Sequence, residues 1–378
     1  MNKLIRSLLF SASLATAMQA APFVAIGDGA ELFATGTLAI RGDDNIFLAD
    51  KAVADTIFDI APGLELDFGK NAQLQGALTL TDTWIRYADR HDLNTNLFVG
   101  DLIAKFDDGK TKYAFNAGYH ELNQNNADIR GLIRRDISTI GGNGEFGVSE
   151  LTSIGVGADY THENYHPAGF VDSNAITIPV NVYYKITPKV DLSVGYRFRD
   201  FQVDNAGNTP DTRDNFYSVG ARGTFTPKLT GRAAVGLTQR KFSTGGLSSR
   251  TMLGLDTSLA YELSPKSTVQ VGATNAFDTS PTGAQQKNLV VNALFTTKVS
   301  EEWMVNVGAS YRRISYYAPI SRSDDYMEGN LGATYIINAN IKLVGSYVYR
   351  GYRTGDDLIK RQIDFDNNVV SIAANFRY

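Results

Sequence analysis

Short turns recur at nearly regular intervals along this chain of 378 residues, and their spacing limits the possible folds more than any other feature. Pro fixes φ in three of the turns, while Gly, Asn and Asp supply backbone freedom in most of the others. The intervals are about 38 residues, enough for one strand, one loop and a second strand. A propeller blade has a similar period but needs four short strands, whereas two long strands fit each interval here. The eight turns are residues 69–72, 107–110, 147–150, 187–189, 226–228, 264–266, 300–302 and 338–340.

Longer polar segments alternate with these turns. Eight turns and nine loops join eighteen strands, and an even number returns the C-terminus to the side where the first strand starts. In outer-membrane barrels the short turns face the periplasm and the longer loops face outside. The sequence therefore predicts an all-β fold, a single transmembrane antiparallel up-and-down β-barrel of about 18 strands. The polar segments are residues 42–54, 88–92, 123–130, 166–173, 204–211, 243–249, 278–283, 318–324 and 351–361.

The strand segments alternate in the way a membrane barrel requires. In residues 190–201, Leu192 and Val194 lie on the face expected to meet lipid, and Arg197 and Arg199 lie on the other. These segments run for about 10 to 14 residues, whereas strands of soluble sandwiches have about 5 or 6. Two segments, 98–106 and 132–146, alternate less clearly, so we expect bulges or a shifted register there. If either segment does not form a strand pair, the barrel would have 16 strands. The clear alternation repeats in residues 229–241 and 303–312.

The last ten residues, 369–378, alternate strictly to the end of the chain. A strand that ends on an aromatic residue resembles the assembly signal of bacterial outer-membrane barrels, so the barrel assembly machinery is an expected partner. This strand should pair with the first strand, near residues 32–40, because lipid cannot solvate an open sheet edge. The expected signal residues are Val370, Ile372, Phe376 and Tyr378.

The N-terminus predicts export. Residues 1–6 are basic and residues 7–17 are apolar and small, the order typical of a cleaved secretory signal, although a helix of the folded protein is an alternative. We predict a signal peptide over 1–21 with an open cleavage site, a short periplasmic segment over 22–30, and the barrel over 31–378.

Composition excludes several classes of protein. Beyond the N-terminus no run of about 18 apolar residues could form a transmembrane helix. A net charge of −4 and a pI of about 5.7 argue against nucleic acid as a partner. The absence of Cys removes disulfides, thiolate metal sites and Cys nucleophiles.

A barrel of this size is too wide for its inward side chains to fill, so we expect a water-filled lumen. No plug is evident in the sequence, and the inward side chains should therefore line and narrow the lumen themselves. Opposed charges across it would set a transverse field that favours polar, sugar-like solutes. Alternatively, the charges pair across neighbouring strands and confer no selectivity. The expected basic residues are Arg197, Arg199, Arg222, Arg232, Arg240, Arg312 and Lys342, and the acidic ones are Asp59, Glu65 and Asp67.

Other polar clusters predict little chemistry. His162, Glu163 and His166 form the one histidine cluster, and no Ser or Asp motif supplies the partner that a hydrolase needs. We therefore expect no catalytic residues, no enzyme activity, no cofactor and no metal site. Paired loop carboxylates could hold a divalent cation, but no calcium-loop pattern surrounds them, so solvated loops are expected. These pairs are Asp43 with Asp44, Asp324 with Asp325, Asp356 with Asp357, and Asp364 with Asp366. Two arginine pairs near loops, Arg134 with Arg135 and Arg312 with Arg313, could meet lipopolysaccharide phosphates or be ordinary exposed charges.

A turn carrying Pro-Lys, followed by the strand over 190–200, a loop, and the strand over 212–221, resembles the putative β-barrel porin 2 family. Residues 312–316 with 324–326, and 349–350, are similar to it as well. The resemblance implies an outer-membrane barrel of a Gram-negative bacterium, and some members accompany exopolysaccharide synthesis and export.

The expected function is an outer-membrane channel for passive passage of small hydrophilic solutes, or a conduit linked to exopolysaccharide export. The alternative is a structural or adhesive barrel with a closed lumen and loops that bind a partner. Expected partners are outer-membrane lipid and lipopolysaccharide, with polysaccharide or small polar solutes in the lumen.

Overall fold

The computed structural model describes residues 22–27, 29–126, 129, 131–204, 209–243, 247–317, 321–357 and 359–378. The predicted signal peptide lies outside the described residues. The segment before the barrel contains a three-residue strand, β1 (Val24–Ile26). Within the described part of the chain, no helix is both long enough and apolar enough to cross a membrane.

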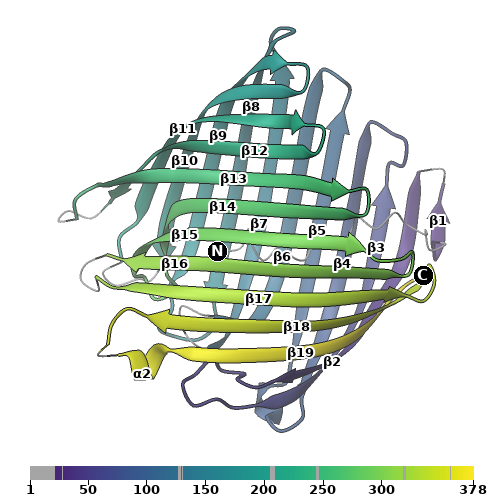
Figure 1. The fold of residues 1–378 in the computed structure, drawn as a ribbon, viewed down its shortest axis with the longest axis vertical. Helices are drawn as coiled ribbons and strands as arrows, with labels where there is room; N and C mark the ends of the chain where they lie inside the picture. The colour runs from purple at the N-terminus through teal and green to yellow at the C-terminus, as the bar shows by residue number, and fades with distance from the viewer. Residues whose placement is uncertain are drawn as a thin grey trace.

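Eighteen strands of 13 to 17 residues follow β1 and form one closed barrel (Figure 1). Each strand pairs with the next in antiparallel register, and β19 closes the sheet by pairing with β2. The prediction of 18 strands is therefore confirmed. The strands are β2 (Ala30–Asp43), β3 (Asp55–Phe68), β4 (Leu74–Tyr87), β5 (Thr95–Asp107), β6 (Thr111–Asn126), β7 (Gly131–Gly147), β8 (Thr152–Tyr165), β9 (Asp172–Thr187), β10 (Val190–Asp204), β11 (Thr212–Thr226), β12 (Leu229–Phe242), β13 (Arg250–Ser264), β14 (Ser267–Thr279), β15 (Gln285–Lys298), β16 (Trp303–Tyr316), β17 (Ser323–Ile336), β18 (Ile341–Thr354) and β19 (Phe365–Arg377).

The connections at the two ends of the barrel differ in length, as the sequence predicts. In Figure 1 the short turns of β13–β18 lie at the right and the longer loops lie at the left, together with the short helix α2 (Lys360–Ile363). A second short helix, η2 (His91–Leu93), lies in the loop between β4 and β5. In the first short turn Gly69 has φ +75°, and a Cβ there would lie 1.8 Å from the carbonyl oxygen of Leu74, so only glycine fits.

The register of the weaker segments is regular, and the expectation of bulges there is wrong. β7 pairs continuously with β6 from Gly131 to Phe146, and β5 pairs continuously with β4. The adjacent charges of β7 fit because they alternate between faces: Arg134 pairs with Glu121, and Arg135 pairs with Glu163. The register shifts occur instead beside short turns, between positions 190 and 191, 224 and 226, and 262 and 264.

The outer face changes from apolar to polar along β10 and its neighbour β11. Val194 is 65% exposed on the lipid-facing surface, and Tyr196 lies one step closer to the loops. The Tyr196 hydroxyl donates to Asn215, and beyond it Arg213 pairs with Asp200 on the same face. Such a band of tyrosines marks the boundary between hydrocarbon and headgroups. Other hydroxyls of this band belong to Tyr160, Tyr311, Tyr347 and Tyr349.

The seam between β19 and β2 is a short ladder of nine residue pairs, from Thr35 to Asp43 on β2. Tyr378 continues it, because its backbone N–H and C=O both bond to Ala34. Below that point β1 pairs with the first residues of β2, and the Phe23 ring lies 6.3 Å from the Tyr378 ring, edge to face. The N-terminal segment thus extends the pairing of the seam. The expected assembly residues Val370, Ile372, Phe376 and Tyr378 all have exposed side chains.

Candidate functional site: the lumen and its outer mouth

All ten predicted pore-lining residues lie on the inner face of the barrel. Each alternates with exposed apolar residues of its own strand, and residues paired across antiparallel strands point to the same face. The acidic group on β3 is neutralised locally. Asp59 pairs with Arg41 at 2.7 Å, and Glu65 and Asp67 each lie 3.1 Å from Arg377. These carboxylates therefore do not stand alone against a basic wall.

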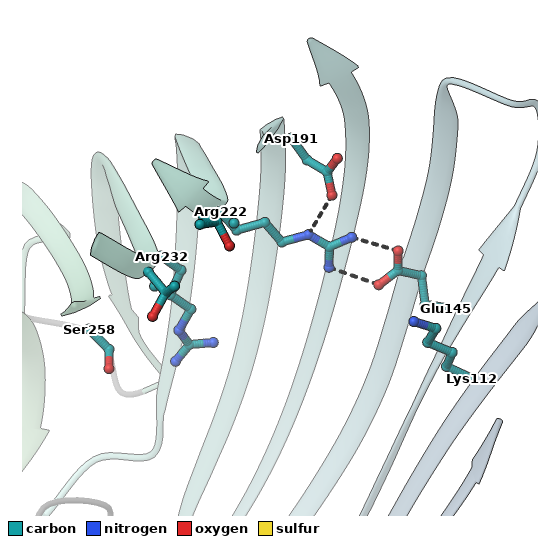
Figure 2. Close-up of a pocket in the computed structure, with 10 residues that line it drawn as sticks. Lys112, Glu145, Asp191, Arg222, Arg232 and Ser258 are labelled. Atoms are coloured by element: carbon teal, nitrogen blue, oxygen red, sulfur yellow. Dashed lines mark hydrogen bonds and ion pairs between the residues drawn. The ribbon is translucent and has the colours of Figure 1, made fainter. Parts of the chain in front are cut away.

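An ion-pair network that joins β7, β10 and β11 is centred on Arg222 of β11. Its guanidinium makes two hydrogen bonds to Glu145 of β7 and one of 3.0 Å to Asp191 of β10 (Figure 2). The guanidinium also stacks on the Tyr183 ring. Because β7 and β11 are four strands apart, the contact with Glu145 runs across the concave inner wall rather than along one ladder.

An open pocket of about 620 Å³ adjoins this network. Figure 2 shows Arg232 and Ser258 on one side of Arg222 and Lys112 on the far side of Glu145. The Arg232 side chain is 68% exposed, and its ion pair with Asp256 is long, at 3.5 Å. The Lys112 side chain is 65% exposed and lies 3.7 Å from Asp107. Arg232 and Lys112 are thus the accessible cations of this pocket, whereas Arg222 is fully engaged.

The remaining basic residues differ in how closely they are paired. Arg197 pairs with Asp256 at 2.8 Å, and its guanidinium lies 4.8 Å from the Phe216 ring. Arg240 is fully buried and donates two hydrogen bonds of 2.7 Å to the Asp214 carboxylate. Arg199 lies 3.8 Å from the same carboxylate.

Arg312 and Lys342 are the last two of the predicted basic residues. The Arg312 guanidinium lies 5.7 Å from the Tyr326 ring. Lys342 has no ion pair among the described residues. Most of the predicted charged residues therefore have an opposite charge within 4 Å, as the alternative of mutual pairing expects.

The first loop, residues 44–54, folds into the outer mouth, which corrects the expectation that the inward side chains alone narrow the lumen. Ile46 and Leu48 are each 1% exposed. Ile46 packs against Ile57 of β3 and Tyr87 of β4, whose side chains point into the barrel. Leu48 packs in a second cluster, which contains Ile314, Tyr316, Tyr352, Ile363 and Phe365. This loop therefore lies against inner-wall residues on both sides of the seam.

Hydrogen bonds hold the same loop at its base. The Asn45 side chain donates to the carbonyl oxygens of Ala49 and Asp366, and Asn367 donates to the Asp43 carboxylate. Asp43, Asn45 and Asn367 are all buried, so these bonds form in a site with little competition from water.

The neighbouring loop between β4 and β5 covers the first loop. The Arg90 guanidinium lies 5.0 Å from the Phe47 ring, and it also bonds to Asp92. The hydrogen bond from Arg90 holds the pKa of the Asp92 carboxyl below its ordinary value. At the start of β3, the Asp55 carboxylate accepts backbone N–H bonds from residues 88–90 and so ties this second loop to the wall.

Loops also approach each other over the other half of the mouth. The backbone N–H of Val171, between β8 and β9, donates to the carbonyl of Pro281, between β14 and β15, at 2.9 Å. Beneath them lie buried polar side chains, including Gln286, whose amide atoms have no hydrogen-bond partner in the described structure. Loops from two distant parts of the chain therefore meet over this half of the mouth.

A family model describes this chain: putative β-barrel porin 2 matches residues 37–378. The chain belongs to the putative β-barrel porin 2 family. Its fold is also similar to solved porin structures. Pseudomonas aeruginosa OccK1 (OpdK) is 9% identical, with 93% of this chain and 100% of that chain covered and a TM-score of 0.50. Acinetobacter baumannii OccAB4 is 12% identical, with 92% and 98% covered and a TM-score of 0.49. No curated protein matches the chain.

Membership of this porin family, together with the 18-strand barrel, places the protein in the bacterial outer membrane as a channel-type fold. Porins are channels and not enzymes. The predicted histidine cluster does not converge: His162 lies 2.9 Å from Asn174, Glu163 pairs with Arg135, and His166 pairs with Asp136.

Asp324 and Asp366, from two of the predicted acidic pairs of this porin-family barrel, have structural partners. Buried Asp324 accepts hydrogen bonds from Tyr352 and Thr354 and pairs with Arg322, and Asp366 pairs with Arg353. Among the described residues, no group of three or more acidic or histidine side chains is arranged to hold a metal ion.

Sequence reasoning missed the acidic partners of the lumen and the inward loop. The partners Glu145, Asp191, Asp214 and Asp256 become visible only when the strand register is known. The loop did leave a signal, because residues 46–48 are three consecutive apolar residues in a segment expected to be polar.

Proposed function

We propose that this barrel is a passive channel for small hydrophilic solutes. The observation that carries the proposal is a closed 18-strand barrel whose inner wall presents charged side chains along its length. Barrels of 16 to 18 strands leave an aqueous channel, because their inward side chains do not reach the axis. A wall of ion pairs can exchange hydrogen bonds with polar solutes while offering little to apolar ones.

Small solutes fit the inner wall better than a polysaccharide chain does. A sugar chain gains most from open aromatic faces, yet the inner-wall rings of Phe33, Phe201 and Phe216 are buried. The guanidinium of Arg377 covers Phe33, and those of Arg199 and Arg197 cover the other two rings. We therefore favour the passage of small solutes. A polysaccharide that passed through the lumen would have to contact the hydrophilic wall without stacking on these rings.

The loop contacts at the mouth favour a second candidate, a barrel with a closed lumen and a structural or adhesive role. Two buried clusters and the bond between Val171 and Pro281 cover inner-wall positions on many strands. In either case, charged residues above the tyrosine band, such as Arg213 and Arg353, would contact lipopolysaccharide phosphates.

Single-channel recording in planar bilayers separates the two candidates. The channel proposal expects stepwise ion currents from purified, folded protein, and liposomes that contain it should swell in isotonic solutions of small sugars. A folded barrel that inserts without current and without sugar uptake would support the closed candidate instead.

A further inference from the structure

The first loop is unusual for a segment at the outer end of a barrel, because its centre is apolar and buried. Residues 46–48 are Ile, Phe and Leu, and the side chains of Ile46 and Leu48 are almost fully removed from solvent. The following residues, 50–54, are exposed. One stretch of the loop is thus anchored inside the mouth, while the next remains in contact with water.

The anchors lie on opposite sides of the seam. The cluster of Ile46 includes residues of β3, β4 and β5, and that of Leu48 includes residues of β16, β18 and β19. Around the barrel these strands fall within one continuous arc from β16 through β19 and β2 to β5, eight of the 18 strands. Two residues separated by one position in the chain therefore take part in covering nearly half of the inner circumference at this end.

The backbone conformation of the loop depends on these anchors. Leu48 has φ +51°, a left-handed conformation that a leucine rarely adopts without support from its surroundings. Its N–H bonds to the carbonyl of Asn45 at 3.0 Å, and its side chain fills the cluster around Ile314. Without that burial, little would favour this turn over the extended forms open to a free loop.

We propose that residues 44–54 are the constriction of this channel and set the largest solute that can pass. The inference rests on the proposed channel function, and it assigns the size limit to one loop rather than to the wall. The solutes expected are small, hydrophilic and compact, because the exposed residues of the loop include the charged side chains of Asp50 and Lys51.

A double variant tests the role of the anchors. Ile46→Ser with Leu48→Ser removes the apolar side chains that hold the loop, and Val53→Ser, at an exposed position of the same loop, is the matched control. Folding is checked by the shift in gel migration that a membrane barrel shows between unheated and boiled samples. Single-channel conductance is then measured, together with the size of the smallest polyethylene glycol that fails to enter the pore.

The constriction proposal predicts a larger conductance and a larger excluded polymer for the folded double variant, with Val53→Ser like the wild type. Equal conductance and equal exclusion size in all three folded proteins would overturn it while leaving the channel function intact. If only the double variant carries current, the proposal that the wild-type channel is open would be overturned. The loop would then be the element that closes the lumen. If none of the three folded proteins carries current, both the channel proposal and the constriction proposal would be overturned.

A chemical measurement tests the position of the loop independently of its anchors. The protein has no Cys, so Lys51→Cys introduces a single thiol at an exposed position of the loop. A bulky, charged methanethiosulfonate forms a mixed disulfide with the Cys thiolate and releases methanesulfinate, and this modification should reduce the current. A thiol reductant should then cleave the disulfide and restore the current. An unchanged current after complete modification would contradict the proposal, since the loop would then lie away from the solute path.

Discussion

Two arginines of the same strand, Arg240 and Arg232, should differ greatly in their contribution to stability. Both lie on the inner face of β12, but the Arg240 side chain is fully buried, whereas that of Arg232 is 68% exposed. Arg240 makes two hydrogen bonds of 2.7 Å to Asp214 and further bonds to the carbonyl of Asp278 and the side chain of Gln285. Arg232 makes one contact of 3.5 Å with Asp256.

The expected magnitudes follow from this difference in burial. Arg240→Gln leaves the Asp214 carboxylate buried with only Arg199 nearby, at 3.8 Å. Removing one partner of a buried ion pair costs about 3–5 kcal/mol. Arg232→Gln breaks a loose pair open to water, and such pairs are worth about 0–1 kcal/mol after screening by solvent. The two substitutions change the same kind of residue by the same number of charges, so each serves as a control for the other.

Equilibrium unfolding in urea, with the protein in lipid vesicles, measures both values. Trp84 and Trp303 report the transition through their fluorescence, because both are on the lipid-facing surface and become exposed to water on unfolding. A decrease in the free energy of unfolding that is several-fold larger for Arg240→Gln is expected. Equal losses for the two variants would refute the argument that burial, and not the mere presence of a charge pair, determines the contribution.

Three further predictions follow from the seam and the lumen. Deletion of residues 376–378 removes the end of β19 and should abolish assembly, seen as loss of the heat-modifiable band in outer-membrane fractions. Phe23→Ala removes the edge-to-face contact with Tyr378 and should lower the free energy of unfolding by about 0.5–1.5 kcal/mol beyond the lost burial; an unchanged urea midpoint would contradict a bracing role for the N-terminal segment. Glu145→Gln leaves the charge of Arg222 partly uncompensated, and reversal potentials in a salt gradient should move toward anion selectivity; a move toward cations would count against the ion-pair account.

The architecture follows from the sequence because its rules are local. Period-two alternation sets which side chains face lipid, so Val194 and Arg197 are assigned to faces from the strand pattern alone. Turn residues such as Gly69 are set by backbone geometry, which does not depend on distant parts of the chain. Both kinds of rule act within a few residues, and the sequence therefore predicts the number of strands correctly.

The charge partners depend on distant parts of the chain, and this explains why the sequence did not predict them. Arg222 meets Glu145 across three intervening strands, a contact set by the curvature of the wall. The inward position of Ile46 and Leu48 depends in the same way on apolar surfaces from both ends of the chain, which come together only when the barrel closes. A sequence pattern records the apolar residues but not the surface that receives them.

The central claim is that the protein is a channel narrowed by its first loop. Single-channel conductance of the wild type and of the folded Ile46→Ser, Leu48→Ser double variant, recorded side by side, tests it most directly. We expect current from both proteins, with the larger conductance in the variant. The absence of current from both folded proteins would contradict the channel function, and identical conductances would contradict the role of the loop as the constriction.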